Sequence, residues 1–121
     1  MTTPGTPEPR EAPTKLVMMI VDDNDADALM STLVASRYSA TKVGSTGGFL
    51  HRGSVTIFCG VTADEVDEVV ALVHETCRAR REFVPMPAIL ADESAFSGEP
   101  IEVRVGGAIV FVLDIDRFER V

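Results

Sequence analysis

The sequence predicts one α+β domain: a ferredoxin-like βαββαβ sandwich with an extra C-terminal hairpin strand. Three observations predict this class. Apolar runs of strand length alternate with two stretches of helical periodicity in the order βαββα, and two more strands follow. Each helical stretch lies between strands, as in a split βαβ unit. With 121 residues, 45% of them apolar, the chain has the length of one domain with a substantial core.

The first part of the chain predicts a strand, a helix and a second strand. Residues 15–21, KLVMMIV, form an apolar run typical of a strand covered on both faces. Behind the cluster of three aspartates and one asparagine at 22–25, apolar side chains recur at helical spacing from Ala26 to Val34. The acids suit a helix N-terminus, where caps and negative charge are favoured. Residues 38–45, YSATKVGS, predict the second strand.

The next part predicts a third strand and a second helix. Residues 55–61, VTIFCGV, have the composition of a buried strand. Thr62 and Glu65 match the capping-box pattern, and an apolar stripe behind them predicts a helix that reaches Cys77. We expect the basic residues that follow to complement the dipole at the end of this helix; they are Arg78, Arg80 and Arg81.

The last part predicts a long loop and a hairpin. Residues 85–100 have no period and are punctuated by proline and glycine, which predicts a long loop, and loops of this length are usually functional or disordered. Residues 101–105 alternate cleanly, residues 108–115 are apolar, and Gly106-Gly107 between them predicts a two-residue hairpin turn. The sheet keeps one apolar face without helices, and we expect oligomerisation to cover it.

Composition excludes several classes of protein. Residues 1–14 hold four prolines and four threonines and no large aliphatic side chain, which predicts a disordered tail before a domain at 15–121. We see neither a signal peptide nor a membrane span and expect a cytoplasmic protein. The net charge of −8 argues against binding to a nucleic acid polymer or to an anionic membrane. We expect Cys59 and Cys77 to be buried free thiols.

No group of residues predicts catalysis or a metal site. Asp23, Asp25 and Asp27 resemble the start of a calcium loop, but Ala28 and Val34 stand where that loop needs glycine and glutamate. Helix capping is therefore the better account of these acids. The two histidines, at positions 51 and 74, have no ligand spacing, and no nucleophile motif is present. We expect neither an enzyme nor a cofactor.

The segment from Thr46 to Gly53 is the candidate binding loop. Gly47 and Gly48 allow backbone N–H groups to approach a phosphate closely, and Phe49 beside them could stack on a base, a contact worth ~1–3 kcal/mol. The residues alone leave a second interpretation open. In it the segment is an ordinary hairpin loop, and Phe49 packs into the core or against another subunit.

Four segments resemble one known family in their order and spacing: IVDDNDADALMSTL, ATKVGSTGGFLHRGS, GVTADEVDEVV and IEVRVGGAIVFVLDIDRF. They are similar to the cyclic di-AMP receptor proteins of the PII-like superfamily, over about residues 15–118. The resemblance implies a bacterial signal receptor rather than an enzyme, built as a homotrimer of ferredoxin-like subunits. It implies a cyclic dinucleotide in clefts between subunits and an unidentified downstream protein partner, to which the 85–100 loop would report the ligand.

The resemblance also implies which residues line the nucleotide pocket. Phe111 matches an aromatic residue contributed across the interface, and Gly47 belongs to the same glycine pair as Gly48. The other matching positions are Thr41, Gly48, Phe49, Leu50 and Gly60.

Three positions depart from the family pattern. Ser39 stands where arginine is usual, Ser54 where asparagine is found, and Arg120 where glutamine is common. Arg37 or Arg120 could partly replace the missing guanidinium. These departures keep two further hypotheses open: a PII-like trimer that binds another nucleotide such as ATP or ADP, and a protein-interaction scaffold that binds none.

Overall fold

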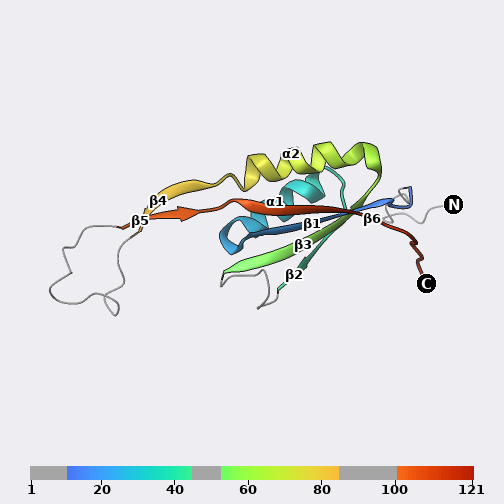
Figure 1. The fold of residues 1–121 in the computed structure, drawn as a ribbon, viewed down its shortest axis with the longest axis horizontal. Helices are drawn as coiled ribbons and strands as arrows, with labels where there is room; N and C mark the ends of the chain where they lie inside the picture. Colours follow the sequence, from blue (N-terminus) through green and yellow to red (C-terminus); the bar gives the residue numbers. More distant parts are fainter. Residues whose placement is uncertain (1–10, 45–52, 85–100) are drawn as a thin grey trace.

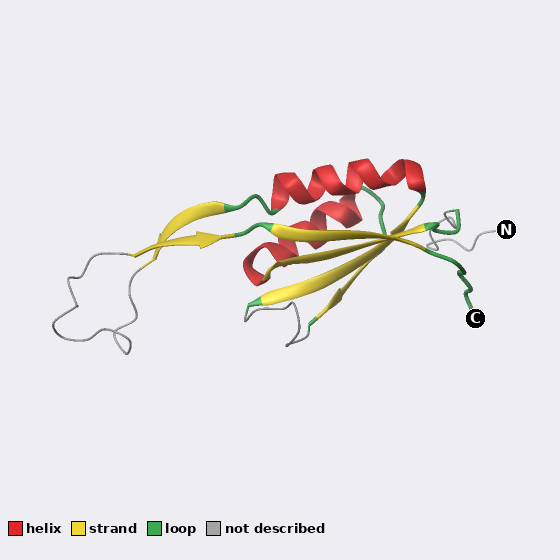
Figure 2. Cartoon of the chain, viewed as in Figure 1, coloured by secondary structure: helices red, strands yellow, loops and turns green. Residues whose placement is uncertain are grey.

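The computed structural model describes residues 11–44, 53–84 and 101–121. The chain forms a mixed α+β structure with antiparallel sheets and two helices, compatible with the predicted ferredoxin-like fold (Figures 1 and 2). Its elements are β1 (Lys15–Asp22), α1 (Asp23–Ala35), β2 (Ala40–Val43), β3 (Ser54–Val61), the 3-10 turn η1 (Ala63–Glu65), α2 (Val66–Thr76), β4 (Arg80–Val84), β5 (Ile101–Val105) and β6 (Ala108–Asp114).

The main sheet has the strand order β2-β3-β1-β6, and all its pairings are antiparallel. The apolar strand β1 is central and pairs along its length with β3 and along nearly all of it with β6. Both helices cover the same face of this sheet (Figure 2). The other face carries no helix of the described segments.

The core lies between the helices and the covered face of the sheet. Alternate residues of β1, namely Val17, Met19 and Val21, are almost completely buried there. The predicted stripe of α1 is buried through Leu29 and Leu33, and such side chains contribute ~1.5–3 kcal/mol each when removed from water. The predicted buried free thiols, Cys59 and Cys77, are confirmed. Neither helix of the described segments is long and apolar enough to cross a membrane.

The predicted caps are confirmed at Asp22, which begins α1, and at Thr62, which begins the 3-10 turn η1 that leads into α2. Asp22 is the N-cap of α1, and its carboxylate accepts a hydrogen bond from the Asn24 backbone N–H at 2.9 Å. Thr62 and Glu65 form the capping box, in which the Thr62 N–H donates to Glu65 Oε1 at 2.9 Å. The acidic segment therefore begins a helix, as capping chemistry predicts.

The predicted hairpin turn at Gly106-Gly107 is wrong. β5 pairs with β4 in a separate two-stranded ribbon, whereas β6 pairs with β1 in the main sheet. The ribbon extends beyond the end of the sandwich (Figure 1). Gly106 and Gly107 have φ of +77° and +83°, so they connect the two sheets with glycine conformations that also suit a tight turn. The glycine pair in the sequence therefore did not distinguish a hairpin turn from a connection between two sheets.

The predicted role of the arginines after α2 is also corrected. Helix α2 ends at Thr76, and Arg80 and Arg81 lie on β4. These two side chains therefore belong to the ribbon, where Arg80 forms an ion pair with Asp25 and Arg81 forms one with Glu102.

The predicted loop at 85–100 lies outside the described residues, and so does most of the predicted tail.

Gly106 makes the first testable prediction. A Cβ at this position would lie 2.6 Å from the Arg78 carbonyl oxygen, and its φ of +77° disfavours side chains. We expect Gly106→Ala to lower the free energy of unfolding by ~1–3 kcal/mol in urea denaturation. Gly44→Ala is the control, because a Cβ at that position would meet nothing within 4 Å among the described residues. Equal stability of the two variants would show that the junction tolerates a side chain.

Candidate functional site

The structure places seven of the predicted pocket residues. Gly47, Gly48, Phe49 and Leu50 lie outside the described residues, so their predicted roles stay predictions. The placed residues occupy the main sheet, the turn before β2 and the C-terminal segment; they are Arg37, Ser39, Thr41, Ser54, Gly60, Phe111 and Arg120.

A row of side chains crosses the helix-free face of the sheet. The register places Thr41 opposite Phe58, Phe58 opposite Met18, and Met18 opposite Phe111. Directly opposed residues of antiparallel strands point to the same side. Because Met19 of the same strand is buried under the helices, the row lies on the opposite face. Thr41 and Phe111, predicted from distant segments, therefore share one surface.

Ser54 and Gly60 share this open face with Phe58, because the three occupy alternate positions on β3. Ser54 and Gly60 are six residues apart, which separates them by roughly 20 Å along the strand. Gly60 lies at the same end of the sheet as Ser39, which directly precedes β2, and Ser54 lies at the end reached by the candidate loop. One subunit thus presents two groups of predicted residues at opposite ends of one face.

Arg37 lies at the C-terminal end of α1 in a left-handed conformation, with φ of +68°. Its N–H donates to the Val34 carbonyl at 2.9 Å, and its side chain is exposed. It lies two positions before Ser39, where the family pattern has arginine. Arg120 is also exposed, in the segment that follows β6. Arg37 and Arg120 thus belong to segments that adjoin the Gly60 end of the sheet, where β2 begins and β6 ends.

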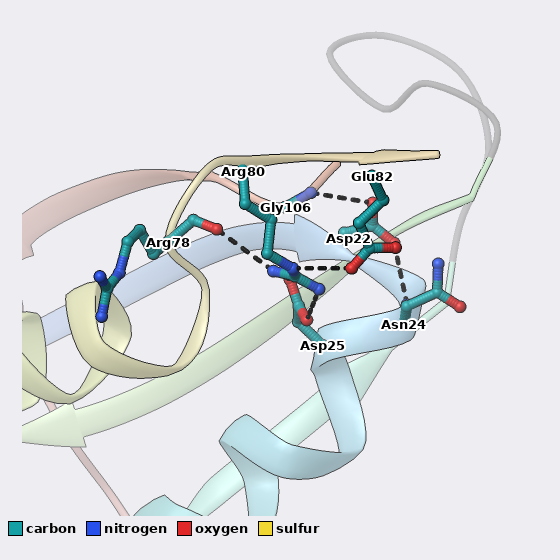
Figure 3. A network of polar contacts seen from close by, with 7 residues as sticks. All are labelled: Asp22, Asn24, Asp25, Arg78, Arg80, Glu82 and Gly106. Atoms are coloured by element: carbon teal, nitrogen blue, oxygen red, sulfur yellow. Dashed lines mark hydrogen bonds and ion pairs between the residues drawn. The ribbon is translucent and has the colours of Figure 1, made fainter. Parts of the chain in front are cut away.

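A polar network at the other end of the sheet was not predicted from the sequence (Figure 3). Arg80 donates from Nη2 to Asp25 Oδ1 at 3.0 Å and from Nη1 to Asp25 Oδ2 at 3.3 Å. Its Nε donates to Glu82 at 3.1 Å. Asp25 is only 6% exposed. The hydrogen bonds to Asp25, and then to Glu82, raise the pKa of the Arg80 guanidinium above its ordinary value.

This network joins three segments of the chain. The Gly106 N–H donates to the Asp22 carboxylate at 3.4 Å. The start of α1 therefore contacts both chain segments at the base of the ribbon, the first residue of β4 through Asp25 and the residue after β5 through Asp22. The Asp23 N–H donates to the Gly53 carbonyl at 2.6 Å and so connects the same turn to the end of the candidate loop. A weak signal existed in the sequence: Asp25 precedes Leu29 and Leu33 by steps of four, which places it on the buried stripe.

Cys77 lies behind this network. Burial of the thiol, and secondly the nearby Asp25 carboxylate, raise the pKa of Cys77 to about 11. The thiol therefore stays protonated at neutral pH. The groove beside it is lined by Asp25, Glu75, Thr76, Arg78 and Arg80, whose charges are mixed in sign.

Two comparisons with known proteins bear on this site. Residues 14–121 match a protein family described as cyclic-di-AMP receptors. The chain is also similar to a protein of Pediococcus pentosaceus ATCC 25745 whose crystal structure is described as that of a functionally unknown protein. The two are 38% identical with a TM-score of 0.70, and the match covers 91% of this chain and 99% of that one.

The Asp25–Arg80 pair makes the second prediction. Asp25→Ala leaves the guanidinium without its bidentate partner and removes a buried carboxylate from the first turn of α1. We expect a loss of about 1–3 kcal/mol of unfolding free energy in urea denaturation. Asp27→Ala is the matched control, because that carboxylate is 93% exposed and its pair with Lys42 is 3.4 Å long. Similar small losses in both variants would contradict the importance of the network.

Proposed function

Because the chain belongs to the cyclic-di-AMP receptor family, we propose that it is a signal receptor that binds cyclic di-AMP in clefts between the subunits of a PII-like homotrimer. The observation that carries this proposal is the family match over residues 14–121, which includes almost all described residues. The placement of predicted pocket residues on one uncovered sheet face supports it. No catalytic group is required, since the proposed activity is binding.

The apolar character of the open face supports the homotrimer. Ile109, Phe111 and Leu113 alternate along β6, point to the open side and are 47%, 37% and 45% exposed. Beside them lie Met18 and Phe58, which the four-stranded sheet only half buries. A second copy of the chain would remove this apolar surface from water. A cyclic assembly repeats the same contact at every interface, so each subunit covers its neighbour.

The separation of Ser54 and Gly60 supports a pocket between subunits. The roughly 20 Å between them exceeds what one adenine and its phosphate could bridge. In a cyclic trimer the interface is heterologous, which means that two different patches of the same chain meet. We propose that the Gly60 end of one subunit meets the loop end of its neighbour and that the ligand lies between them.

A pocket of this kind needs few positive charges. Cyclic di-AMP carries two phosphodiester groups, and a chain with a net charge of −8 can hold them only through local donors. Backbone N–H groups at Gly47-Gly48 would supply neutral donors, and Arg37 or Arg120 would supply a guanidinium in place of the arginine that Ser39 lacks. The ribbon and residues 85–100 would carry the ligand state to a protein partner.

The assembly prediction is direct. We expect light-scattering chromatography at micromolar concentration to give about 39 kDa, three times the 13.0 kDa of the chain. Phe111→Glu should shift the protein toward a monomer, because it places a charge in the proposed apolar interface. Arg81→Glu on the ribbon is the control for an added acid. A monomeric wild-type protein would contradict both the trimer and the intersubunit pocket.

The ligand prediction uses the departure at Ser54. Replacing the hydroxyl by a longer amide, Ser54→Asn, should add a hydrogen bond to the adenine edge. One net hydrogen bond is worth ~0.5–1.5 kcal/mol, so titration calorimetry should show affinity for cyclic di-AMP improved by roughly two- to ten-fold. Thr56→Asn is the control, since Thr56 lies on the same strand and face but is not a predicted contact.

Two results would count against this proposal. If the wild-type trimer binds ATP or ADP in preference to cyclic di-AMP, the ligand is wrong and the fold is retained. If no nucleotide raises the melting temperature at millimolar concentration, the scaffold hypothesis replaces the receptor. A bound ligand at one hundred times its dissociation constant stabilises a protein by ~2.7 kcal/mol, which a thermal shift detects easily.

A further inference from the structure

The segment before β1 lies against the open face of the sheet at Gly60. A Cβ built on Gly60 would be 3.1 Å from Pro13 Cβ and 3.2 Å from Pro13 Cγ. Gly60 occupies an open-face position of β3, so the absent side chain would point away from the helices. The pyrrolidine ring of Pro13 therefore fills the space that the missing side chain leaves on this face.

Hydrogen bonds hold this segment in place. The Thr14 N–H donates to the Val61 carbonyl at 2.9 Å, and the Ile115 N–H donates to the Thr14 carbonyl at 3.0 Å. Thr14 is thus tied to the end of β3 on one side and to the residue after β6 on the other. These bonds fix the direction in which the chain enters β1. They place Pro13, which is half-buried, over the sheet and not in solvent.

Pro13 lies outside the part of the chain that matches the family, which begins at residue 14. Its contact with Gly60 joins this preceding residue to a strand of the matched domain. Gly60 is also a residue to which the proposed function gives a place in the ligand pocket. A ligand that reaches the Gly60 backbone from the open face would enter the volume that the Pro13 ring now occupies.

We infer that Pro13 is an autoinhibitory contact: its ring occupies the Gly60 end of the ligand site, and cyclic di-AMP binds only after displacing it. This inference rests on the proposed function. Because the ligand and the ring exclude each other, part of the binding free energy is used to release the segment. The apparent dissociation constant is then the intrinsic one divided by the fraction of molecules in which the site is open. Ligand binding would in turn free the chain before β1.

Titration calorimetry of the full-length chain with cyclic di-AMP tests the contact. Pro13→Gly removes both ring atoms that face Gly60, so we expect it to bind about three- to ten-fold more tightly than wild type. Ala12→Gly is the matched control, because it adds similar backbone freedom at an exposed neighbouring position and keeps the ring. It should bind like wild type. Equal or weaker binding by Pro13→Gly would overturn the inference.

Amide hydrogen exchange of Thr14 gives a second readout. If the ligand displaces Pro13, the bond from Thr14 to Val61 should loosen, and exchange at Thr14 should accelerate at least several-fold in the complex. Slower exchange on ligand binding would show that Pro13 stays in place and lines the site. That result would contradict this inference but not the proposed function. Absence of binding in all three proteins would contradict the proposed function and, with it, this inference.

Discussion

The structure depends on the one-sided covering of its central strand. β1 is apolar on both faces, and it pairs with β3 on one side and β6 on the other. Two helices bury Val17, Met19 and Val21, but no helix of the described segments covers the face that carries Met18 and its neighbours. An antiparallel sheet with helices on one face can solvate a polar second face, but an apolar one favours association. The open face therefore sets both the proposed assembly and the proposed ligand site.

The first turn of α1 organises the opposite end of the molecule. Within four residues it caps its own helix, pairs Asp25 with Arg80, accepts from Gly106 and donates to Gly53. These contacts place the base of the ribbon and the end of the candidate loop beside each other. In the proposed receptor, a change in the loop would reach the ribbon through these directional contacts rather than through apolar packing, which orients elements less specifically. We propose this connection as the route from ligand to partner.

Local chemistry predicted most of the individual elements. The buried run of β1, the stripes of both helices and the caps at Asp22 and Thr62 depend on neighbours within a few residues, so each could be recognised from its own segment. The candidate site was reached differently. Thr41, Gly60 and Phe111 were named from a family resemblance, and no periodicity in the chain points to them as ligand residues.

By itself, then, the sequence determined the order of the strands and helices except for β4, the burial of both cysteines and the family to which the chain is similar. Only the tertiary structure decided that β5 joins β4, that Asp25 pairs with Arg80 across 55 positions and that Pro13 covers Gly60. The physical reason is the range of the interactions. Periods and caps are properties of neighbouring residues, whereas strand partners and buried ion pairs are chosen by which distant segments pack together. No local pattern records that choice.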